Sequence, residues 1–227
     1  MRFDILTLFP ELIEAFASSS VIGRGRAAGC FELETHQIRD YSADKHHRVD
    51  DTPYGGGKGM LMSAEPVCAC HADAAKDPQG KYPKTRTIFL SPKGKVLTQK
   101  KAEELSSYDR LILLCGHYEG IDRRAIDEVV DEEISCGDYV LTGGELPACI
   151  LIDCVARLLP GVLAAEECYE NESIACGMLE YPQYTRPEVF HGVRVPQVLL
   201  DGNHKEIDKW RYKEAVELTK KLRPDLI

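Results

Sequence analysis

Two glycine-containing segments have residue types and spacing that suit ligand binding. They are CGHYEGID, residues 115–122, and CGDYVLTGGELP, residues 136–147. Glycine lets backbone approach a ligand closely, and the free N–H and C=O groups can bind an adenine, a ribose or an amino-acid moiety. We therefore predict that both segments line a ligand pocket, with a purely structural role as tight turns as the alternative.

A basic residue, Arg157, lies near the end of the almost wholly apolar stretch from Glu145 to Leu159. Gly143-Gly144 before the stretch and Pro147 in its first turn predict a helix. A helix that is apolar nearly all round is buried in a core or a subunit interface. The guanidinium either pairs with Asp153 within this helix or marks a site or a subunit boundary.

Other motifs do not fit the binding sites that they suggest at first. The segment 53–60, PYGGGKGM, lacks the Ser or Thr that a phosphate-binding loop needs after its lysine, and residues 23–28, GRGRAA, follow a predicted helix where a dinucleotide site needs a strand. Adjacent His46 and His47 do not converge on one metal ion. The nine cysteines are odd in number, and we expect reduced thiols.

The elements that must position the glycine segments follow an α/β pattern. Short apolar runs at 4–9, 87–90 and 111–114 predict buried strands, rough alternation at 31–38 predicts another, and residues 11–17 read as a helix. Strands that alternate with helices indicate a parallel sheet, whose ligands collect at the carboxyl ends of its strands. Both glycine segments are expected at that edge.

A change in composition predicts two domains. Residues 161–176 lose periodicity and become acidic, which is typical of a linker. We expect a ligand-binding domain over 1–160 and a small, mainly helical domain over 177–227. In the second domain we predict a strand at 195–200, a turn at 201–204 and a helix that ends at Leu222.

Charge is unevenly distributed. The net charge of -9 argues against general nucleic-acid binding, but residues 81–101 hold seven basic residues and no acidic one. Such a strip suits a polyanion held at one place, or else it is a solvated surface. No leader or membrane-spanning run is found, so we expect a cytoplasmic protein.

At these motifs the chain closely resembles the bacterial tRNA (guanine-N1)-methyltransferases that modify the guanine just 3′ of the anticodon. The matching segments occur in family order along nearly the whole chain: LFPE (8–11), VDDTPYGGGKGMLM (49–62), LSPKG (90–94), LCGHYEGID (114–122), GDYVLTGGELP (137–147), LLPGVL (158–163), YPQYTRPEVF (181–190), VPQVLLDGNH (195–204) and the Trp210-Arg211 helix.

The resemblance implies a trefoil-knotted methyltransferase fold, a homodimer whose sites use both subunits, and the anticodon stem-loop of tRNA as partner, without DNA or membrane. It implies S-adenosylmethionine as methyl donor and no metal ligand, and leaves a divalent-ion requirement open. The residues that would hold the donor are Leu90, Gly116, Tyr118, Cys136, Gly137, Asp138, Tyr139, Val140, Leu141, Gly143, Gly144 and Pro147.

The resemblance also assigns the chemistry. Arg157 would stabilise O6 of the guanine, and Asp50 would assist in the guanine pocket. The family has an aspartate as general base just before a serine in the linker, whereas this sequence has Glu172 before Ser173. Two alternatives stay open, a knotted methyltransferase with another RNA target and a non-catalytic RNA-binding homologue. We also expect a shortened carboxyl-terminal tail.

Overall fold

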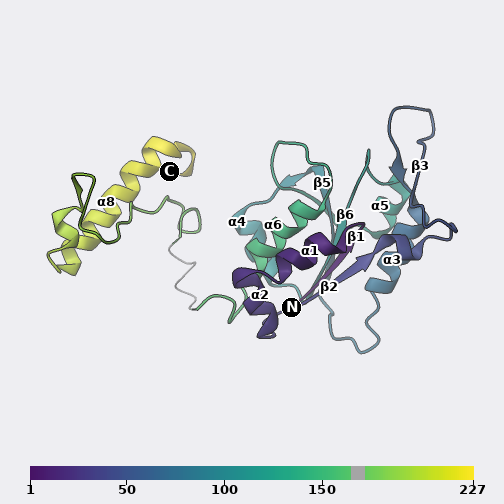
Figure 1. The fold of residues 1–227 in the computed structure, drawn as a ribbon, viewed down its shortest axis with the longest axis horizontal. Coiled ribbons are helices and arrows are strands. Elements are labelled where there is room, and N and C mark those ends of the chain that lie inside the picture. Colours follow the sequence, from purple (N-terminus) through teal and green to yellow (C-terminus); the bar gives the residue numbers. More distant parts are fainter. Residues whose placement is uncertain (165–171) are drawn as a thin grey trace. The chain divides into compact units, whose positions relative to one another are not determined.

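The computed structural model describes residues 1–164 and 172–227. The chain forms two compact units, Met1–Ala164 and Ala165–Ile227 (Figure 1). The first unit is an α/β domain and the second is built around one long helix.

A five-stranded sheet organises the first unit. Its strands are β1 (Arg2–Thr7), β2 (Glu32–Gln37), β5 (Thr85–Val96), β6 (Arg110–Cys115) and β7 (Glu132–Ser135), in the order β2-β1-β6-β5-β7. Every pairing is parallel, which confirms the predicted α/β class. All residues of the central strand β6 are buried, as expected of a strand covered on both faces.

Helices cover both faces of this sheet (Figure 1). Alternate residues of β6 point to opposite faces, so Leu111 and Leu113 belong to one apolar cluster and Ile112 and Leu114 to the other. The first cluster also contains side chains of α1 (Pro10–Ala17), α2 (Ser20–Ala27), α4 (Gln99–Ser106) and α6 (Glu145–Ala156). The second contains side chains of α3 (Ala64–Ala74) and α5 (Arg123–Val129).

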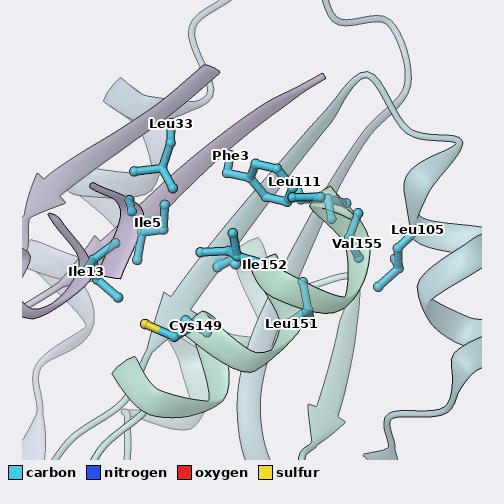
Figure 2. Packing of buried hydrophobic residues seen from close by; sticks show 14 of the residues in the cluster. Phe3, Ile5, Ile13, Leu33, Leu105, Leu111, Cys149, Leu151, Ile152 and Val155 are labelled. Carbon is cyan, nitrogen blue, oxygen red and sulfur yellow. The ribbon is translucent and has the colours of Figure 1, made fainter. Parts of the chain in front are cut away.

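Helix α6 supplies the centre of the first cluster. Leu151, Ile152 and Val155 are fully buried, and they face strand residues such as Phe3 and Leu111 (Figure 2). Burial of each such side chain contributes about 1.5–3 kcal/mol. The helix is therefore fixed to the sheet, and its first turn lies at a defined place.

Strand β5 is longer than its apolar run predicted. Pairing with β7 shifts register between Leu90 and Lys95 and then resumes, so residues 91–95, SPKGK, form an irregularity within the strand. A side chain at Gly94 would collide with the backbone of Glu133 and Ile134. Glycine is needed here because two backbones touch.

Two short ribbons and several turns complete the units. Strands β3 (Asp50–Asp51) and β4 (Leu61–Met62) pair antiparallel, as do β8 (Val189–Phe190) and β9 (Val193–Arg194). Short 3-10 helices occur at Ile38–Tyr41, Gln197–Leu199 and Pro224–Leu226, and helix α8 spans His204–Leu222.

One prediction about the elements is wrong, and another is refined. The strand expected at 195–200 is wrong, because a 3-10 turn forms there, with Leu199 N–H bonded to Pro196 O at 3.0 Å. Pro196 has no N–H to give to a strand partner. The segment 23–28, expected to follow a helix, lies mostly inside α2.

Candidate functional site

A pocket of about 270 Å³ opens at the carboxyl edge of the sheet. It is formed by the middle of β5, by the end of β7, by the segments that follow β6 and β7, and by the first turn of α6. Its walls come from residues of four segments: Phe89, Leu90, Ser91 and Pro92; Gly116, His117, Tyr118, Glu119 and Gly120; Ile134, Ser135 and Cys136; and Tyr139, Val140, Leu141, Thr142, Gly143, Gly144 and Pro147. The two glycine segments thus meet at one cavity, where open α/β sheets bind ligands.

Two residues of the predicted donor-binding set do not line this pocket, Gly137 and Asp138. Gly137 instead determines the conformation of the loop that carries Tyr139. Its φ is +152°, and a side chain there would collide with the ring of Tyr139, which folds back over it. The Tyr139 hydroxyl donates to Cys136 O at 3.2 Å. Glycine at this position therefore shapes the loop that carries Tyr139 to the pocket.

Close backbone contact joins the two glycine segments. Gly144 N–H donates to Gly116 O at 3.0 Å. A Cβ at Gly144 would lie 2.7 Å from Cys115 Cα, and a Cβ at Gly116 would lie 2.9 Å from the Phe89 ring. The absence of side chains is therefore what lets the pocket walls come together.

Glu145, His117 and Thr7 form a polar network beneath this pocket, and sequence reasoning assigned none of them. Glu145 is 3% exposed, and its two oxygens contact Thr7 Oγ1 at 2.6 Å and His117 Nε2 at 2.7 Å. Burial, together with the nearby Glu145 charge, raises the pKa of the Cys149 thiol to about 11 and that of Cys115 well above its usual value. Both thiols are therefore protonated and unreactive at neutral pH.

Several pocket residues that were not predicted individually belong to motifs that the sequence analysis recognised. Ser91 and Pro92 belong to LSPKG, and His117, Glu119 and Gly120 belong to CGHYEGID, so the motifs pointed to the right loops. Single residues within a loop could not be ranked, because side-chain direction there is not periodic.

Asp50 lies beside the pocket and not in its wall. It pairs with Met62 in the β3–β4 ribbon, and Met62 N–H donates to Gly120 O at 2.9 Å. A second cavity of about 870 Å³ adjoins this ribbon and is lined by Asp51–Gly55, Leu61–Glu65, Cys68, Asp122, Arg124 and Glu128. The ribbon that bears Asp50 is thus attached to a loop of the first pocket.

Arg157 does not line the pocket, and Glu172 belongs to the second unit. Arg157 follows the last residue of α6, and Pro147, which lines the pocket, is in the first turn. Ten residues of helix separate them by ~15 Å at 1.5 Å per residue. Glu172 is half-buried in the second unit, where Cys176 N–H donates to its carbonyl oxygen at 3.4 Å.

The basic strip of residues 81–101 is partly neutralised within the chain. Lys81 pairs with Glu32 at 2.5 Å, and Arg86 and Lys101 both contact Glu132, at 3.4 and 2.8 Å. Lys93 and Lys95 are exposed on the irregular part of β5. Lys93 and Lys95 are therefore more available for binding a polyanion than Lys81, Arg86 and Lys101, which are paired within the chain.

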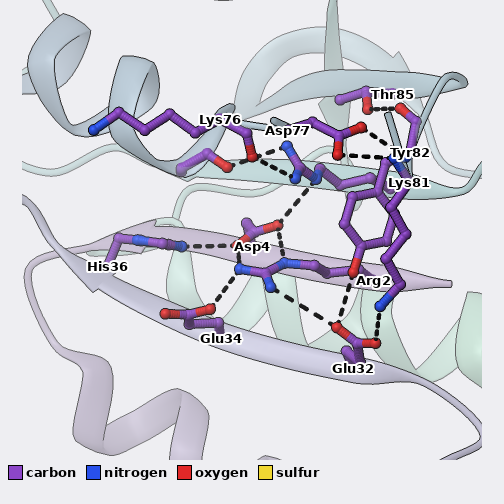
Figure 3. Close-up of polar contacts among 12 residues, drawn as sticks. Arg2, Asp4, Glu32, Glu34, His36, Lys76, Asp77, Lys81, Tyr82 and Thr85 are labelled. Atoms are coloured by element: carbon purple, nitrogen blue, oxygen red, sulfur yellow. Dashed lines mark hydrogen bonds and ion pairs between the residues drawn. The ribbon is translucent and has the colours of Figure 1, made fainter. Parts of the chain in front are cut away.

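A different cluster of charges closes the amino-terminal edge of the sheet (Figure 3). Within the described residues, Asp4, Glu34 and His36 lie close enough together to hold a metal ion. Arg2 bonds both Asp4 and Glu34, so a guanidinium already supplies the positive charge there. None of Asp4, Glu34 and His36 lines the pocket.

Two further findings concern the described residues. All cysteines of 1–164 and 172–227 are free thiols. None of the helices described is long and apolar enough to cross a membrane.

Comparison with known proteins agrees with the resemblance of the sequence motifs. The family described as tRNA (Guanine-1)-methyltransferase TrmD matches residues 1–227. Proteins named tRNA (guanine-N(1)-)-methyltransferase from Ruminiclostridium cellulolyticum and Lachnospira eligens are 54% and 53% identical, over 100% of this chain and 96% and 94% of theirs. The Clostridioides difficile protein of that name is 50% identical, over 100% of this chain and 97% of its own. The chain belongs to the tRNA (guanine-N1)-methyltransferase family.

Proposed function

We propose that the chain methylates N1 of the guanine just 3′ of the anticodon of tRNA, with S-adenosylmethionine as methyl donor. One observation carries this proposal. The two segments that family resemblance assigns to the donor, one after β6 and one after β7, line a single pocket at the carboxyl edge of the sheet. Family membership supplies the transferase activity and the tRNA substrate.

The pocket suits S-adenosylmethionine in shape and chemistry. Glycine brings backbone amides and carbonyls to the cavity, and the rings of Tyr118 and Tyr139, each about half exposed, border it. An adenine, a ribose and an amino-acid moiety need such backbone donors and acceptors beside apolar surface. When bound, the donor supplies an activated methyl group on its sulfonium, so the protein mainly has to position it.

The proposed chemistry centres on guanine N1, which carries a proton and is a weak nucleophile while it keeps it. Glu172 accepts that proton, Arg157 stabilises the negative charge that builds toward O6, and Asp50 assists in the guanine pocket. Glutamate in place of the family's aspartate keeps the carboxylate and lengthens its reach by one methylene.

The position of Arg157 supports a homodimer. Its backbone is ~15 Å along α6 from Pro147 in the pocket wall, too far for one chain to use both at one methyl group. In the proposed dimer, Arg157 of one protomer completes the pocket of its partner. The 53% exposed Leu146 and the 41% exposed Ile150, one turn apart on α6, offer apolar surface for this interface.

The path of the chain after β7 supports the proposed trefoil knot. β7 is an edge strand, yet the loop after it crosses to β6, two strands away, where Gly144 bonds Gly116. Residues 1–160 form the proposed methyltransferase domain, 161–176 the linker, of which 165–171 lie outside the described residues, and 177–227 the tRNA-binding domain. The substrate tRNA implies that the protein works in the cytoplasm.

Methylation of a tRNA transcript tests the proposal directly. With S-adenosylmethionine and a transcript that has guanine 3′ of the anticodon, we expect one methyl group at N1 of that guanine, mapped by nuclease digestion and mass spectrometry. A transcript with adenine at that position is the matched control and should stay unmodified. Methylation of another nucleotide would indicate a different specificity, and donor binding without turnover would indicate a non-catalytic RNA-binding protein.

A further inference from the structure

Glu145 is a buried acid that the proposed chemistry does not use. It is the first residue of α6 and is 3% exposed. Thr7 ends β1, and His117 follows β6, so Glu145 joins three segments at the carboxyl edge of the sheet. A carboxylate this deeply buried is tolerated only when both oxygens have partners, and here they do.

The proton positions follow from the hydrogen-bond geometry. Thr7 Oγ1 accepts from Phe9 N–H at 2.9 Å, so its own single proton is donated to Glu145 Oε1 at 2.6 Å. With Glu145 as the acceptor of a second hydrogen bond, His117 donates to its Oε2 from Nε2 at 2.7 Å. This arrangement requires the His117 tautomer that has its proton on Nε2.

The His117 ring is held from other sides as well. Its centroid lies 4.9 Å from that of the Phe9 ring, and its backbone N–H donates to Met62 Sδ at 3.3 Å. His117 itself lines the pocket. The network therefore sets where one wall of the pocket lies.

The second glycine segment rests on the same two side chains. A Cβ at Gly143 would collide with the His117 ring and would lie 2.7 Å from Glu145 Oε2. Gly143, which lines the pocket, thus packs directly against the His117–Glu145 pair. Any movement of that pair changes the spacing between the two glycine segments.

We propose that Glu145 is a positioning residue for the methyl donor, acting with Thr7 and His117 to hold the two glycine segments at the spacing the donor requires. This role rests on the proposed function, since it presumes that the donor binds between those segments. Glu145 acts through His117 and Gly143, without touching the reacting atoms. Supporting groups of this kind determine how precisely a site is preorganised.

Calorimetric titration with S-adenosylmethionine and with S-adenosylhomocysteine, its uncharged thioether product, tests the role. We expect E145Q and Thr7→Val to bind both ligands about tenfold more weakly, because E145Q replaces charge-assisted hydrogen bonds with neutral ones and Thr7→Val removes a hydrogen bond to the charged group. Thr7→Ser restores the hydroxyl and should recover affinity for both. The control E103Q, an exposed glutamate on α4, should bind like the wild type.

Three outcomes would overturn the proposal. Unchanged affinities in E145Q and Thr7→Val would show that the network does not set the pocket. Loss for S-adenosylmethionine alone would mean that the Glu145 charge attracts the sulfonium directly. Failure of Thr7→Ser to recover binding would show that the Thr7 hydroxyl does not contribute to donor binding. Thr7→Val conserves volume and keeps the comparison available if E145Q folds poorly.

A measurement without donor separates this proposal from the proposed function. Nitrogen-15 NMR of the unliganded protein should show His117 protonated at Nε2, and E145Q should move the proton to Nδ1, because the new amide donates to Nε2. An unchanged His117 tautomer in E145Q would contradict the proposed link between Glu145 and His117, whether or not the donor binds. A wild-type protein that shows the expected tautomer and binds neither ligand would contradict the proposed function alone.

Discussion

At the scale of single residues, Glu172 has the largest expected effect on the chemical step. E172Q removes the proposed base and keeps the shape of the side chain. We expect the single-turnover rate of methyl transfer to fall by about 10²- to 10⁴-fold, the usual cost of losing a general base. Binding of tRNA and of S-adenosylmethionine should stay near wild type. Single-turnover rates report the chemistry separately from product release.

The companion variant E172D tests the departure from the family. If the backbone can deliver either carboxylate, E172D keeps or exceeds the wild-type rate, and if the backbone has adjusted to the longer side chain, the rate falls. Full activity of E172Q would rule Glu172 out as the base. Glu170 would then be the next carboxylate to replace.

Gly116 and Gly143 give a residue-scale test of the pocket. A Cβ at Gly116 would lie 2.9 Å from the Phe89 ring, and one at Gly143 would meet Glu145 at 2.7 Å. Gly116→Val and Gly143→Val should therefore abolish measurable binding of S-adenosylmethionine in calorimetry. Circular dichroism should show that both variants are folded. Wild-type affinity in both folded variants would contradict this location for the donor.

At the scale of elements, the charge cluster at the amino-terminal edge of the sheet predicts how stability depends on pH. Burial raises the pKa of Asp4, but the hydrogen bonds and charges of His36 and Arg2 outweigh it, and the folded-state pKa is lowered. A carboxyl whose pKa is lowered by folding stabilises above its unfolded pKa, about 4, and loses that contribution as pH falls through the folded value.

Replacing Asp4 tests this relation. Asp4→Asn should lower the free energy of unfolding by about 3–5 kcal/mol at pH 7, because it removes the buried carboxylate that pairs with the buried Arg110. It should also flatten the loss of stability below about pH 4. Urea unfolding should be followed by circular dichroism, since the single tryptophan, Trp210, belongs to the other unit.

The control for Asp4 is E34Q, which alters an exposed partner of the same Arg2. It should cost less than about 1 kcal/mol, as exposed ion pairs do. Equal destabilisation by both variants, or no change for Asp4→Asn, would contradict the dominant role of the buried pair.

The irregular part of β5 gives the electrostatic test. Lys93 and Lys95 are exposed there, and we expect the double variant K93A/K95A to bind tRNA more weakly. Its plot of log affinity against log salt concentration should be shallower by about 0.7 for each phosphate that the variant no longer neutralises. The matched control is K81A, because Lys81 is already paired with Glu32. An identical slope in K93A/K95A and wild type would make this strip a solvated surface.

Elements differ in how much the sequence reveals of them. The central strand β6 could be predicted, because burial on both faces demands the unbroken apolar run of 111–114. The edge strand β7, with the sequence EEIS, was not predicted, since it has only four residues and half of them are only partly buried. The prediction of a strand at 195–200 was wrong because Pro196 has no N–H with which the segment could pair in a sheet.

The pocket was predictable as loops and not as side-chain contacts. The glycine residues indicated the two segments, because a position where backbone must approach closely requires glycine and can be recognised from the local sequence. The bond between Thr7 and Glu145 joins residues that are 138 positions apart, and no local pattern encodes such a pair. Only the strand order, which places β1 beside β6, brings them together.

At the scale of the whole molecule, the proposed dimer predicts a mass of about 51 kDa in light scattering, twice the 25.4 kDa of one chain. Mixing tests the shared site more sharply. Arg157→Ala and Gly143→Val should each be inactive alone. After both are unfolded and refolded together, half of the dimers are mixed and one of their two sites has intact parts, so about a quarter of wild-type activity should return.

The control for mixing is refolding each variant by itself, which should restore nothing. A fully active monomer, or no recovery in the mixture although mixed dimers form, would contradict a site shared between protomers.

The strand order also has a consequence for synthesis. β1 is made first and can pair with β2 early, but its other neighbour, β6, begins only at Arg110. At a ribosomal rate of about 5–20 residues per second, that edge of β1 waits roughly 5–20 s for its partner. During this interval the nascent chain presents β1, in which Phe3, Ile5 and Leu6 are apolar, with an open edge. Until Pro147 has emerged from the ribosome, the growing chain lacks a wall of the donor pocket, so the ligand cannot help it to fold.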